Sequence, residues 1–266
     1  MLATLEGYAV EGGFDRAYEP ATCYSPTIAL GRHPGPGDAC GLWRDYERVL
    51  DLVPSLGLDG VRLTLEWARI EPRRGVVDEG ALVRYREVIA HARSLGLDAT
   101  VVVVDAAWPS WLGLEAWLLP WVGEYLVAHA RRVVDAVGDL ATGLRVFADR
   151  VGIVERGFLV GEAPPWRRGA TDDAASALER SGELERALRG DPLVGPRLVG
   201  AARTLSLEGP LDALRSAWID ARGCDEVYVR SLVGGVGPSA VPTGLLARGK
   251  DQWAPTAAAE LLAVFV

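Results

Sequence analysis

Carboxylate side chains follow several apolar, branched segments of this sequence. Glu66, Asp105 and Asp149 each come after such a segment, and Glu208 follows the apolar stretch 202–207. Apolar runs of this kind are typical of buried parallel strands, whose carboxyl ends deliver polar groups to a site. Two neighbouring carboxyl groups raise one another's pKa and can hold one proton between them, which is the requirement for general acid and base chemistry.

The same four residues also have structural interpretations. Asp149 could form an ion pair at a strand end with the adjacent Arg150, and Glu208 could cap the loop before Pro210. Salt bridges to Arg62 or Arg69 are the commoner fate of residues such as Glu66 and Asp105. An oxygen-only metal site built from Glu66, Asp105 and Asp149 lacks a recognisable loop spacing, so no metal is expected.

The elements that must position these residues alternate between strand and helix. The segment Ser55-Leu-Gly-Leu-Asp59 recurs as Ser94-Leu-Gly-Leu-Asp98, each time between a helical pattern and an apolar strand. Apolar spacing and breaker residues predict strands over 3–10, 60–66, 97–104, 143–148, 202–207 and 226–232, and helices within 41–56, 82–92, 120–137, 172–188, 210–221 and 255–265. The pattern favours an α/β fold of the TIM-type (β/α) barrel class.

A doubly wound sheet is the competing fold. Neither a GxGxxG nor a GxxxxGK[ST] motif follows any predicted strand, so that fold lacks support and no cofactor is expected. With 266 residues, of which 49% are hydrophobic, the chain suits a single barrel-like domain over 1–266.

The composition of the chain limits which partners and which cellular compartment we expect. The formal net charge is −8 and basic runs are absent, so nucleic acid is not an expected partner. The three cysteines, Cys23, Cys40 and Cys224, form no CxxC pair, which favours a reducing compartment. Without a signal segment or membrane-length apolar run, we expect a cytoplasmic protein that acts on a small molecule and does not engage a membrane.

Two segments resemble glycoside hydrolase family 1, the family of β-glucosidases and their relatives. Val61-Arg-Leu-Thr-Leu-Glu-Trp-Ala-Arg-Ile-Glu-Pro72 is similar to the family's second-strand motif Tyr-Arg-Phe-Ser-Ile-Ser-Trp-Ser-Arg-Ile-x-Pro. Val103-Val-Asp-Ala-Ala-Trp-Pro-Ser-Trp-Leu112 is similar to its third-strand motif Leu-Tyr-His-Trp-Asp-Leu-Pro-x-Trp-Leu, and Tyr228-Val-Arg-Ser-Leu232 resembles the last strand. The resemblance covers about two thirds of the chain and implies a TIM-type barrel.

The resemblance also assigns roles. Asp149, within Ala148-Asp-Arg150, takes the place of the general acid/base in the family's Asn-Glu-Pro motif, and Glu208 takes the place of the nucleophile if one residue is deleted. Without that gap Leu207 takes the nucleophile position. Arg62 matches the arginine that supports the nucleophile, and Glu11 keeps the Glu of the family's Gln-Ile-Glu-Gly, so both are expected to bind substrate.

Most of the sugar-reading residues of the family are replaced. Ala9 stands in place of the motif's Gln, Asp105 in place of the sugar-binding His, and Gly234-Gly-Val-Gly-Pro238 in place of Asp-Asn-x-x-Glu-Trp. The 208 − 149 = 59 residues between Asp149 and Glu208 are also too few for three strand crossings, which need on the order of 90 residues. The barrel is therefore expected to be incomplete or remodelled between its fourth and seventh strands, with 196–200 as a vestigial strand. An open edge of this kind could pair two copies as a homodimer.

Tryptophans are concentrated around the expected mouth of the barrel. Trp67 and Trp111 are expected to pack in the core, whereas Trp108, Trp117 and Trp166 are expected to bind an apolar or sugar surface. We therefore expect a glycosidase-like hydrolase that acts on a hydrophobic or modified glycoside through paired carboxylates. Two alternatives are a repurposed scaffold that performs other acid/base chemistry through Glu66, Asp105 and Asp149, and a protein that only binds a small apolar metabolite.

Overall fold

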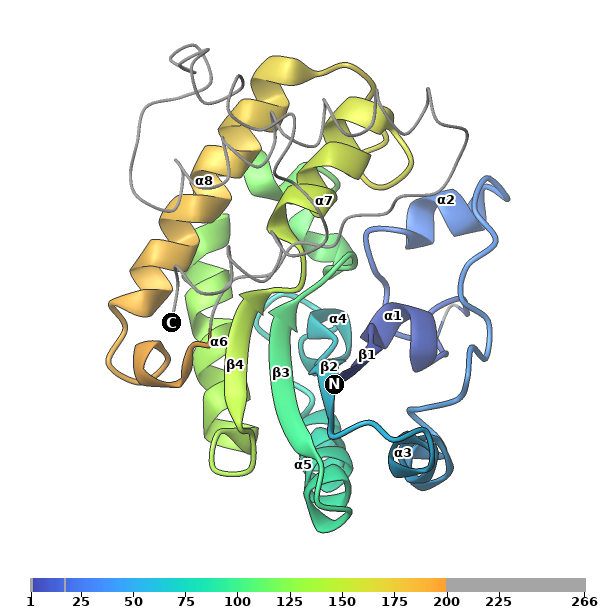
Figure 1. Cartoon of the computed structure of the whole chain (residues 1–266). Helices are drawn as coiled ribbons and strands as arrows, with labels where there is room; N and C mark the ends of the chain where they lie inside the picture. The colour runs from blue at the N-terminus through green and yellow to red at the C-terminus, as the bar shows by residue number, and fades with distance from the viewer. Residues whose placement is uncertain (1, 17, 200–266) are drawn as a thin grey trace, which may run out of the picture.

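A four-stranded parallel sheet forms the centre of the molecule (Figure 1). The computed structural model describes residues 2–16 and 18–199. The strands lie in chain order: β1 (Leu2–Leu5), β2 (Gly60–Thr64), β3 (Asp98–Val104) and β4 (Gly143–Phe147). Each successive pair is joined by a helical crossover, so the described residues form the first four strands of the predicted TIM-type barrel.

Four longer helices lie between or after the strands: α3 (Tyr46–Ser55), α5 (Glu79–Ser94), α6 (Val122–Val137) and α8 (Thr171–Arg189). Short helical segments occupy the loops, namely α1 (Gly7–Val10), α2 (Ser25–Ala29), α4 (Trp67–Ile70), α7 (Arg150–Val154), the 3₁₀ turns Ser110–Leu112, Ala116–Leu118 and Gly195–Arg197, and a π-helical turn Glu155–Val160. The helices predicted within 41–56, 82–92, 120–137 and 172–188 are thus confirmed.

The Ser-Leu-Gly-Leu-Asp repeat joins a helix to a strand in both of its copies. α3 ends just before Gly57 and α5 just before Gly96, and these glycines have φ of 71° and 77°. Left-handed backbone after a helix strongly favours glycine, because it has no Cβ to clash with the following carbonyl. Both copies of the repeat therefore form the same turn, which leads from α3 into β2 and from α5 into β3.

The two faces of the sheet differ in chemistry. Residues that face the helices are apolar and at most 3% exposed, and they include Val61, Leu63, Val101, Val103 and Leu144. The alternate positions, which face the barrel interior, include Arg62, Thr100 and Arg145. Barrel interiors are usually filled by branched aliphatic side chains, and Val102, Val104 and Phe147 lie on this face too, so its two arginines are the unusual feature.

The first strand is shorter than predicted. The strand expected over 3–10 ends at Leu5, and Gly7–Val10 forms the single-turn helix α1. A Cβ at Gly7 would lie 2.6 Å from the carboxyl group of Glu66, so only glycine lets the chain turn here against the end of β2. Strands β2 and β4 also end early, at Thr64 and Phe147, one or two residues before the predicted ends.

Residues 150–197 form one crossover, which connects β4 to residues 198 and 199. After α8, Leu198 forms a parallel bridge with Leu144, and the Val199 N–H donates to the Leu144 carbonyl at 2.8 Å. This contact beside β4 agrees with the strand remnant expected over 196–200. The segments predicted after residue 200, including Glu208 and the motif 228–232, lie outside the described residues.

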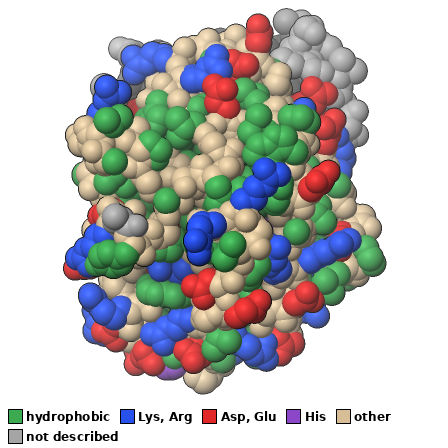
Figure 2. Space-filling view, turned by 180° about the vertical axis from the view of Figure 1, so that it is seen from behind, with side chains coloured by type: hydrophobic (Ala, Val, Ile, Leu, Met, Phe, Trp, Pro, Cys, Tyr) green, Lys and Arg blue, Asp and Glu red, His purple; other side chains and the backbone are tan. Residues whose placement is uncertain are grey.

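Charged side chains of both signs are interspersed on the face seen in Figure 2, with hydrophobic groups among them. Within the described part of the chain, the helices lack the combination of length and apolar character needed to cross a bilayer.

Candidate functional site

Acidic side chains collect where the four strands end. Glu6 directly follows β1, Glu66 lies two residues beyond β2, Asp105 directly follows β3, and Asp149 lies two residues beyond β4. The carboxyl ends of the strands are the face on which (β/α) barrels carry their chemistry. Three of these four residues were predicted at the site.

Asp105 is held between two neighbouring groups. The Thr64 hydroxyl donates to Oδ2 and the Ala106 backbone N–H donates to Oδ1, both at 2.8 Å. The residue is 5% exposed, and this burial raises the pKa of its carboxyl group, although both hydrogen bonds and the charges of Arg62 and Arg156 act in the opposite direction. Asp105 is therefore oriented by two hydrogen bonds, and its burial disfavours the charged form.

Asp149 caps the short helix α7. Its Oδ1 accepts a hydrogen bond from the Gly152 backbone N–H at 2.9 Å, and the residue is half-buried. The neighbouring Arg150 extends to α8, where it donates to the Leu178 carbonyl at 2.5 Å and lies 3.5 Å from Glu185. The cap fixes the orientation of Asp149, and Arg150 anchors α7 against α8.

Glu66 lies inside the molecule, below the strand ends. It is 1% exposed, and its Oε1 accepts a hydrogen bond from the Tyr8 backbone N–H at 2.7 Å. Its Oε2 has no hydrogen-bond partner among the described residues. Burial, followed by the charges of Glu11 and Asp105, raises the pKa of Glu66 well above 4.5. Burial beneath helix α1 thus disfavours the charged form of Glu66.

Glu11 belongs to a buried ion pair. Arg69 Nε lies 2.9 Å from Glu11 Oε2, and the Tyr85 hydroxyl donates to Oε1 at 2.7 Å. The Arg69 guanidinium also lies 4.0 Å from the ring centre of Trp43 and 4.4 Å from that of Phe14. Arg69 is thus paired with Glu11 rather than with Glu66. A substrate-binding role for Glu11 remains a prediction, at a side chain that is 2% exposed.

The tryptophans predicted at the mouth separate into two groups. Trp108 and Trp117 are each 1% exposed and pack edge to face with ring centres 5.6 Å apart, within the main hydrophobic core. Trp67 is equally buried and stacks on His129, and the partly buried Trp111 packs edge to face against it, as expected of core residues.

Trp166 is only partly buried and has a positive φ of 63°. Its ring centre lies 5.7 Å from those of Tyr24 and His33, so the loop after β4 contacts the loop after β1 through an aromatic cluster. Tyr8 extends this cluster by stacking on Tyr24 at 4.7 Å. Of the three predicted binding tryptophans, Trp166 is the one placed at a partly open surface.

Sequence reasoning missed Glu6. This exposed residue follows β1, and partial desolvation together with the charges of Asp105 and Asp149 raises the pKa of its carboxyl group, while Arg156 and Arg62 oppose that shift. Arg62 faces the barrel interior, and its Nε is buried without a partner in the described part of the chain. The one available signal was the acidic residue before Gly7, within a run that appeared to be strand interior.

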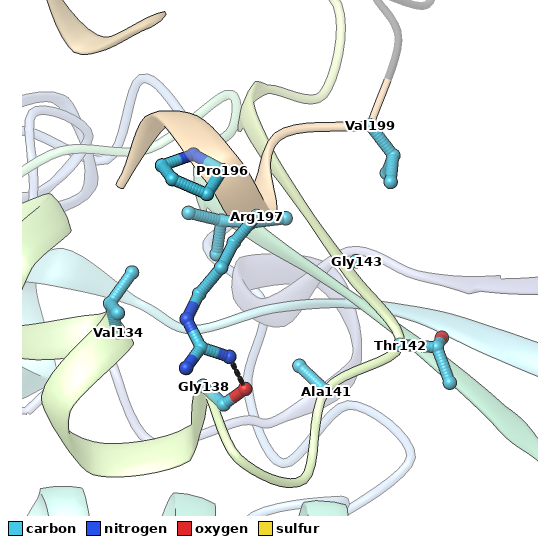
Figure 3. A pocket seen from close by; sticks show the side chains of 9 residues that line it. Val134, Gly138, Ala141, Thr142, Gly143, Pro196, Arg197 and Val199 are labelled. Atoms are coloured by element: carbon cyan, nitrogen blue, oxygen red, sulfur yellow. Dashed lines mark hydrogen bonds between the residues drawn. The ribbon is translucent and has the colours of Figure 1, made fainter. Parts of the chain in front are cut away.

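Among residues 2–16 and 18–199, no group of three His, Cys, Asp or Glu side chains is arranged to hold a metal ion. A cavity of about 250 Å³ lies at the opposite end of β4, beside Gly143 (Figure 3). There Arg197 donates to the Gly138 carbonyl at the end of α6, so this cavity is separate from the strand-end carboxyl groups.

A parallel sheet with helical crossovers and polar groups at the carboxyl ends of its strands is the arrangement of TIM-type barrels. Similarity to a solved structure supports this fold. A β-glycosidase from Pyrococcus horikoshii superposes with a TM-score of 0.68 at 20% identity, over 88% of this chain and 54% of that chain. The predicted TIM-type barrel fold is thereby confirmed.

Curated relatives agree with the fold. "Beta-glucosidase-like SFR2, chloroplastic" from Oryza sativa subsp. japonica is 25% identical over 185 residues, which are 67% of this chain and 29% of that protein. "Galactolipid galactosyltransferase SFR2, chloroplastic" from Arabidopsis thaliana is 25% identical over 114 residues, 40% of this chain and 18% of that protein. No family model matches the chain.

The chain is thus similar in sequence to β-glucosidases and in fold to a solved β-glycosidase, in agreement with the resemblance of its sequence motifs. It spans less than a third of the length of the curated relative from rice and about half of the solved structure.

Proposed function

We propose that the chain hydrolyses a hydrophobic or modified glycoside through carboxyl groups at the ends of its strands. The observation that carries this proposal is the pair Asp105 and Asp149 at adjacent strand ends of a glycosidase-type sheet. Glycoside hydrolysis needs one carboxyl group that protonates the leaving oxygen and a second that acts as base or nucleophile. The half-buried Asp149, at the acid/base position of the family motif, is the carboxyl group that a substrate can reach, and Asp105 is the buried carboxyl group at the neighbouring strand end.

The preference for an apolar glycoside rests on what lines the strand ends. Ala9 and Ala148 stand where the family motifs have polar residues, and Tyr8, Tyr24 and Trp166 form an aromatic cluster between the loops that follow β1 and β4. Aromatic faces favour apolar ring or chain surfaces over heavily hydroxylated ones. The printed name of one relative, a galactolipid galactosyltransferase, is in keeping with a lipid-linked sugar.

A panel of aryl and long-chain alkyl glycosides tests the proposal with the full chain. We expect release of the aryl or alkyl alcohol, faster for apolar aglycones than for methyl glycosides, and a loss of at least about 100-fold in Asp149→Asn. Glu208→Gln tests the second predicted carboxylate in the same assay. Full activity in Asp149→Asn would contradict the proposal.

Other acid/base chemistry on a small apolar metabolite is the second candidate. Glu66 and Asp105 favour it, because burial raises the pKa of both carboxyl groups and the motifs of glycoside hydrolase family 1 have Ser and His at these positions. Absence of turnover across the glycoside panel, combined with a loss of ligand-induced thermal stabilisation in Asp105→Asn, would favour this function over hydrolysis.

A further inference from the structure

Loops from the two outer strands of the described sheet meet through aromatic rings. Tyr24 and His33 lie in the loop after β1, and Trp166 lies in the loop after β4. The ring centres of Tyr24 and His33 are 5.0 Å apart, and that of Trp166 is 5.7 Å from both. Because β1 and β4 are separated in the sheet by β2 and β3, this contact bridges the ends of the two inner strands.

Two buried acids lie close to this bridge. The Cys23 N–H, directly before Tyr24, donates to the Trp108 carbonyl at 2.8 Å, so the β1 loop is fixed to the segment that follows Asp105. Burial raises the pKa of the Tyr24 hydroxyl, and the charges of Asp105 and Glu66 raise it further, so the phenol lies within electrostatic reach of both acids. Asp105 and Glu66 are 5% and 1% exposed, so neither acid is open to a ligand in this arrangement.

The contact has an energetic cost at Trp166. The indole Nε1 is buried without a hydrogen-bond partner among the described residues. A buried donor without an acceptor is costly, because water would otherwise accept its hydrogen bond. The backbone φ of 63° is also left-handed, which is unfavourable for a bulky side chain. Separation of the rings lets water reach Nε1, so opening recovers part of the free energy that the ring contacts lose.

The backbone is held more firmly on one side of the contact than on the other. The Trp166 N–H donates to the Ala163 carbonyl at 2.7 Å, within the loop after β4. His33 lies in the largely exposed segment Gly31-Arg-His-Pro-Gly-Pro-Gly37, whose glycines have φ of 66°, 67° and 59°. Hinges are a few loop residues that absorb backbone rotation. We therefore expect the segment that carries His33 to move while the indole stays in place.

We propose that the loops after β1 and β4 form a gate over the strand ends, which is closed by the contact of Trp166 with Tyr24 and His33. Withdrawal of His33 frees one side of the indole and of the phenol, and a flat apolar group can pack there in its place. The open gate thus admits a flat, apolar ligand to Asp105. That this ligand is the aglycone of a glycoside rests on the proposed function, whereas the opening itself does not.

Hydrogen exchange of the indole N–H groups measures the opening directly by NMR of the full chain. Trp166 and Trp117 both bury Nε1 without a partner in the described part of the chain, and Trp117 lies in the hydrophobic core, so it is the internal control. In His33→Ala the Trp166 N–H should exchange at least about 10-fold faster than in the wild type, at a rate independent of low urea concentrations, while Trp117 keeps its rate. Equal acceleration of both indoles, or of neither, would overturn the proposal.

Alkylation of Cys23 measures whether the opening reaches the acids. Burial raises the pKa of this thiol and the nearby charge of Glu66 contributes, so Cys23 lies beside the same acids. With Cys40→Ser and Cys224→Ser, Cys23 is the one remaining thiol of the chain. The neutral aryl reagent N-phenylmaleimide should alkylate it at least about 10-fold faster when Trp166→Ala is added, whereas Trp166→Phe, which keeps a ring, should retain the unaltered rate.

Trp121→Ala is the matched control for the alkylation. Trp121 is also partly buried, but its ring packs against Tyr125 rather than in the gate, so its removal should leave the rate of Cys23 unchanged. Equal rates in Trp166→Ala and Trp121→Ala would overturn the proposal. A Trp166→Ala rate that rises steeply from the lowest urea concentrations would reflect global unfolding and would also overturn it.

Neither measurement needs a substrate, which separates the gate from the proposed function. A chain whose gate opens as expected but which hydrolyses no glycoside refutes the proposed function alone. An active chain in which Trp166 exchange and Cys23 alkylation do not respond to these replacements refutes the gate alone.

Discussion

Replacement of Arg69 by Met should be among the most destabilising single changes in the described structure. The guanidinium is paired with Glu11 at 2.9 Å and donates to the Gly12 carbonyl at 2.9 Å, and the two side chains are 7% and 1% exposed. Methionine fills similar space between Trp43 and Phe14 but leaves Glu11 buried without its cation. Removal of one partner of a buried ion pair costs about 3–5 kcal/mol of unfolding free energy, a large share of a typical stability of about 5–15 kcal/mol.

The pH dependence of this loss has a definite sign. Burial already raises the pKa of Glu11 in the folded chain, and Arg69 opposes that increase. Without Arg69, the pKa of Glu11 in the folded chain rises further above its value in the unfolded chain. The loss of unfolding free energy therefore grows as the pH rises above about 4.5, and it shrinks at lower pH, where Glu11 is protonated. Urea unfolding of the variant and the wild type should therefore show a larger difference at pH 7.5 than at pH 5.

Two further variants test whether the loss comes from the unpaired charge of Glu11. Arg86→Met removes the exposed pair with Asp139, whose side chains are 46% and 58% exposed, and should cost less than about 1 kcal/mol. The double variant Arg69→Met/Glu11→Gln should recover a large part of the loss, because the unpaired charge is removed with its partner. A cost for Arg69→Met as small as that of the surface pair, or one independent of pH, would refute the account of the pair.

Two other predictions concern buried titratable groups. Glu66→Gln should stabilise the chain at pH 7.5 and lose that advantage near pH 4.5. The reason is that the raised pKa of Glu66 makes the wild type less stable by up to about 1.4 kcal/mol per pH unit above 4.5. Chemical denaturation at both pH values measures the difference in unfolding free energy, and a difference that does not change with pH would contradict the prediction. Burial lowers the pKa of His129 to about 3. Between pH 7 and pH 4.5 the wild type should therefore lose roughly 2–3 kcal/mol of unfolding free energy relative to His129→Gln. Thermal unfolding across that pH range tests this, and parallel pH profiles of the two chains would rule it out.

Local sequence determined the repeated part of the fold. The Ser-Leu-Gly-Leu-Asp segments predicted both turns, because a left-handed glycine after a helix is a purely local requirement. The end of β1 was placed wrongly, since apolar content alone does not distinguish the last strand residues from the single turn of α1. That boundary depends on Glu66, which is 59 residues away from Gly7.

The candidate site was only partly predictable for the same reason. Strand-end positions identified Asp105 and Asp149, but the depth of Glu66 depends on helix α1, which covers it. The pairing of Glu11 with Arg69 joins residues 58 apart in the chain. Indole exposure at Trp108 and Trp117 likewise depends on distant packing partners such as Phe147. Glu6 was missed because its assignment depended on the misplaced strand end.

The most direct test of the central claim is kcat/KM of Asp149→Asn on the aryl glycoside that the wild type cleaves fastest. Asparagine can still accept the Gly152 N–H and cap α7, so the variant should unfold at nearly the wild-type midpoint. We predict a loss of at least about 100-fold in kcat/KM in this folded variant. Wild-type kcat/KM in Asp149→Asn would contradict carboxylate chemistry at the strand ends.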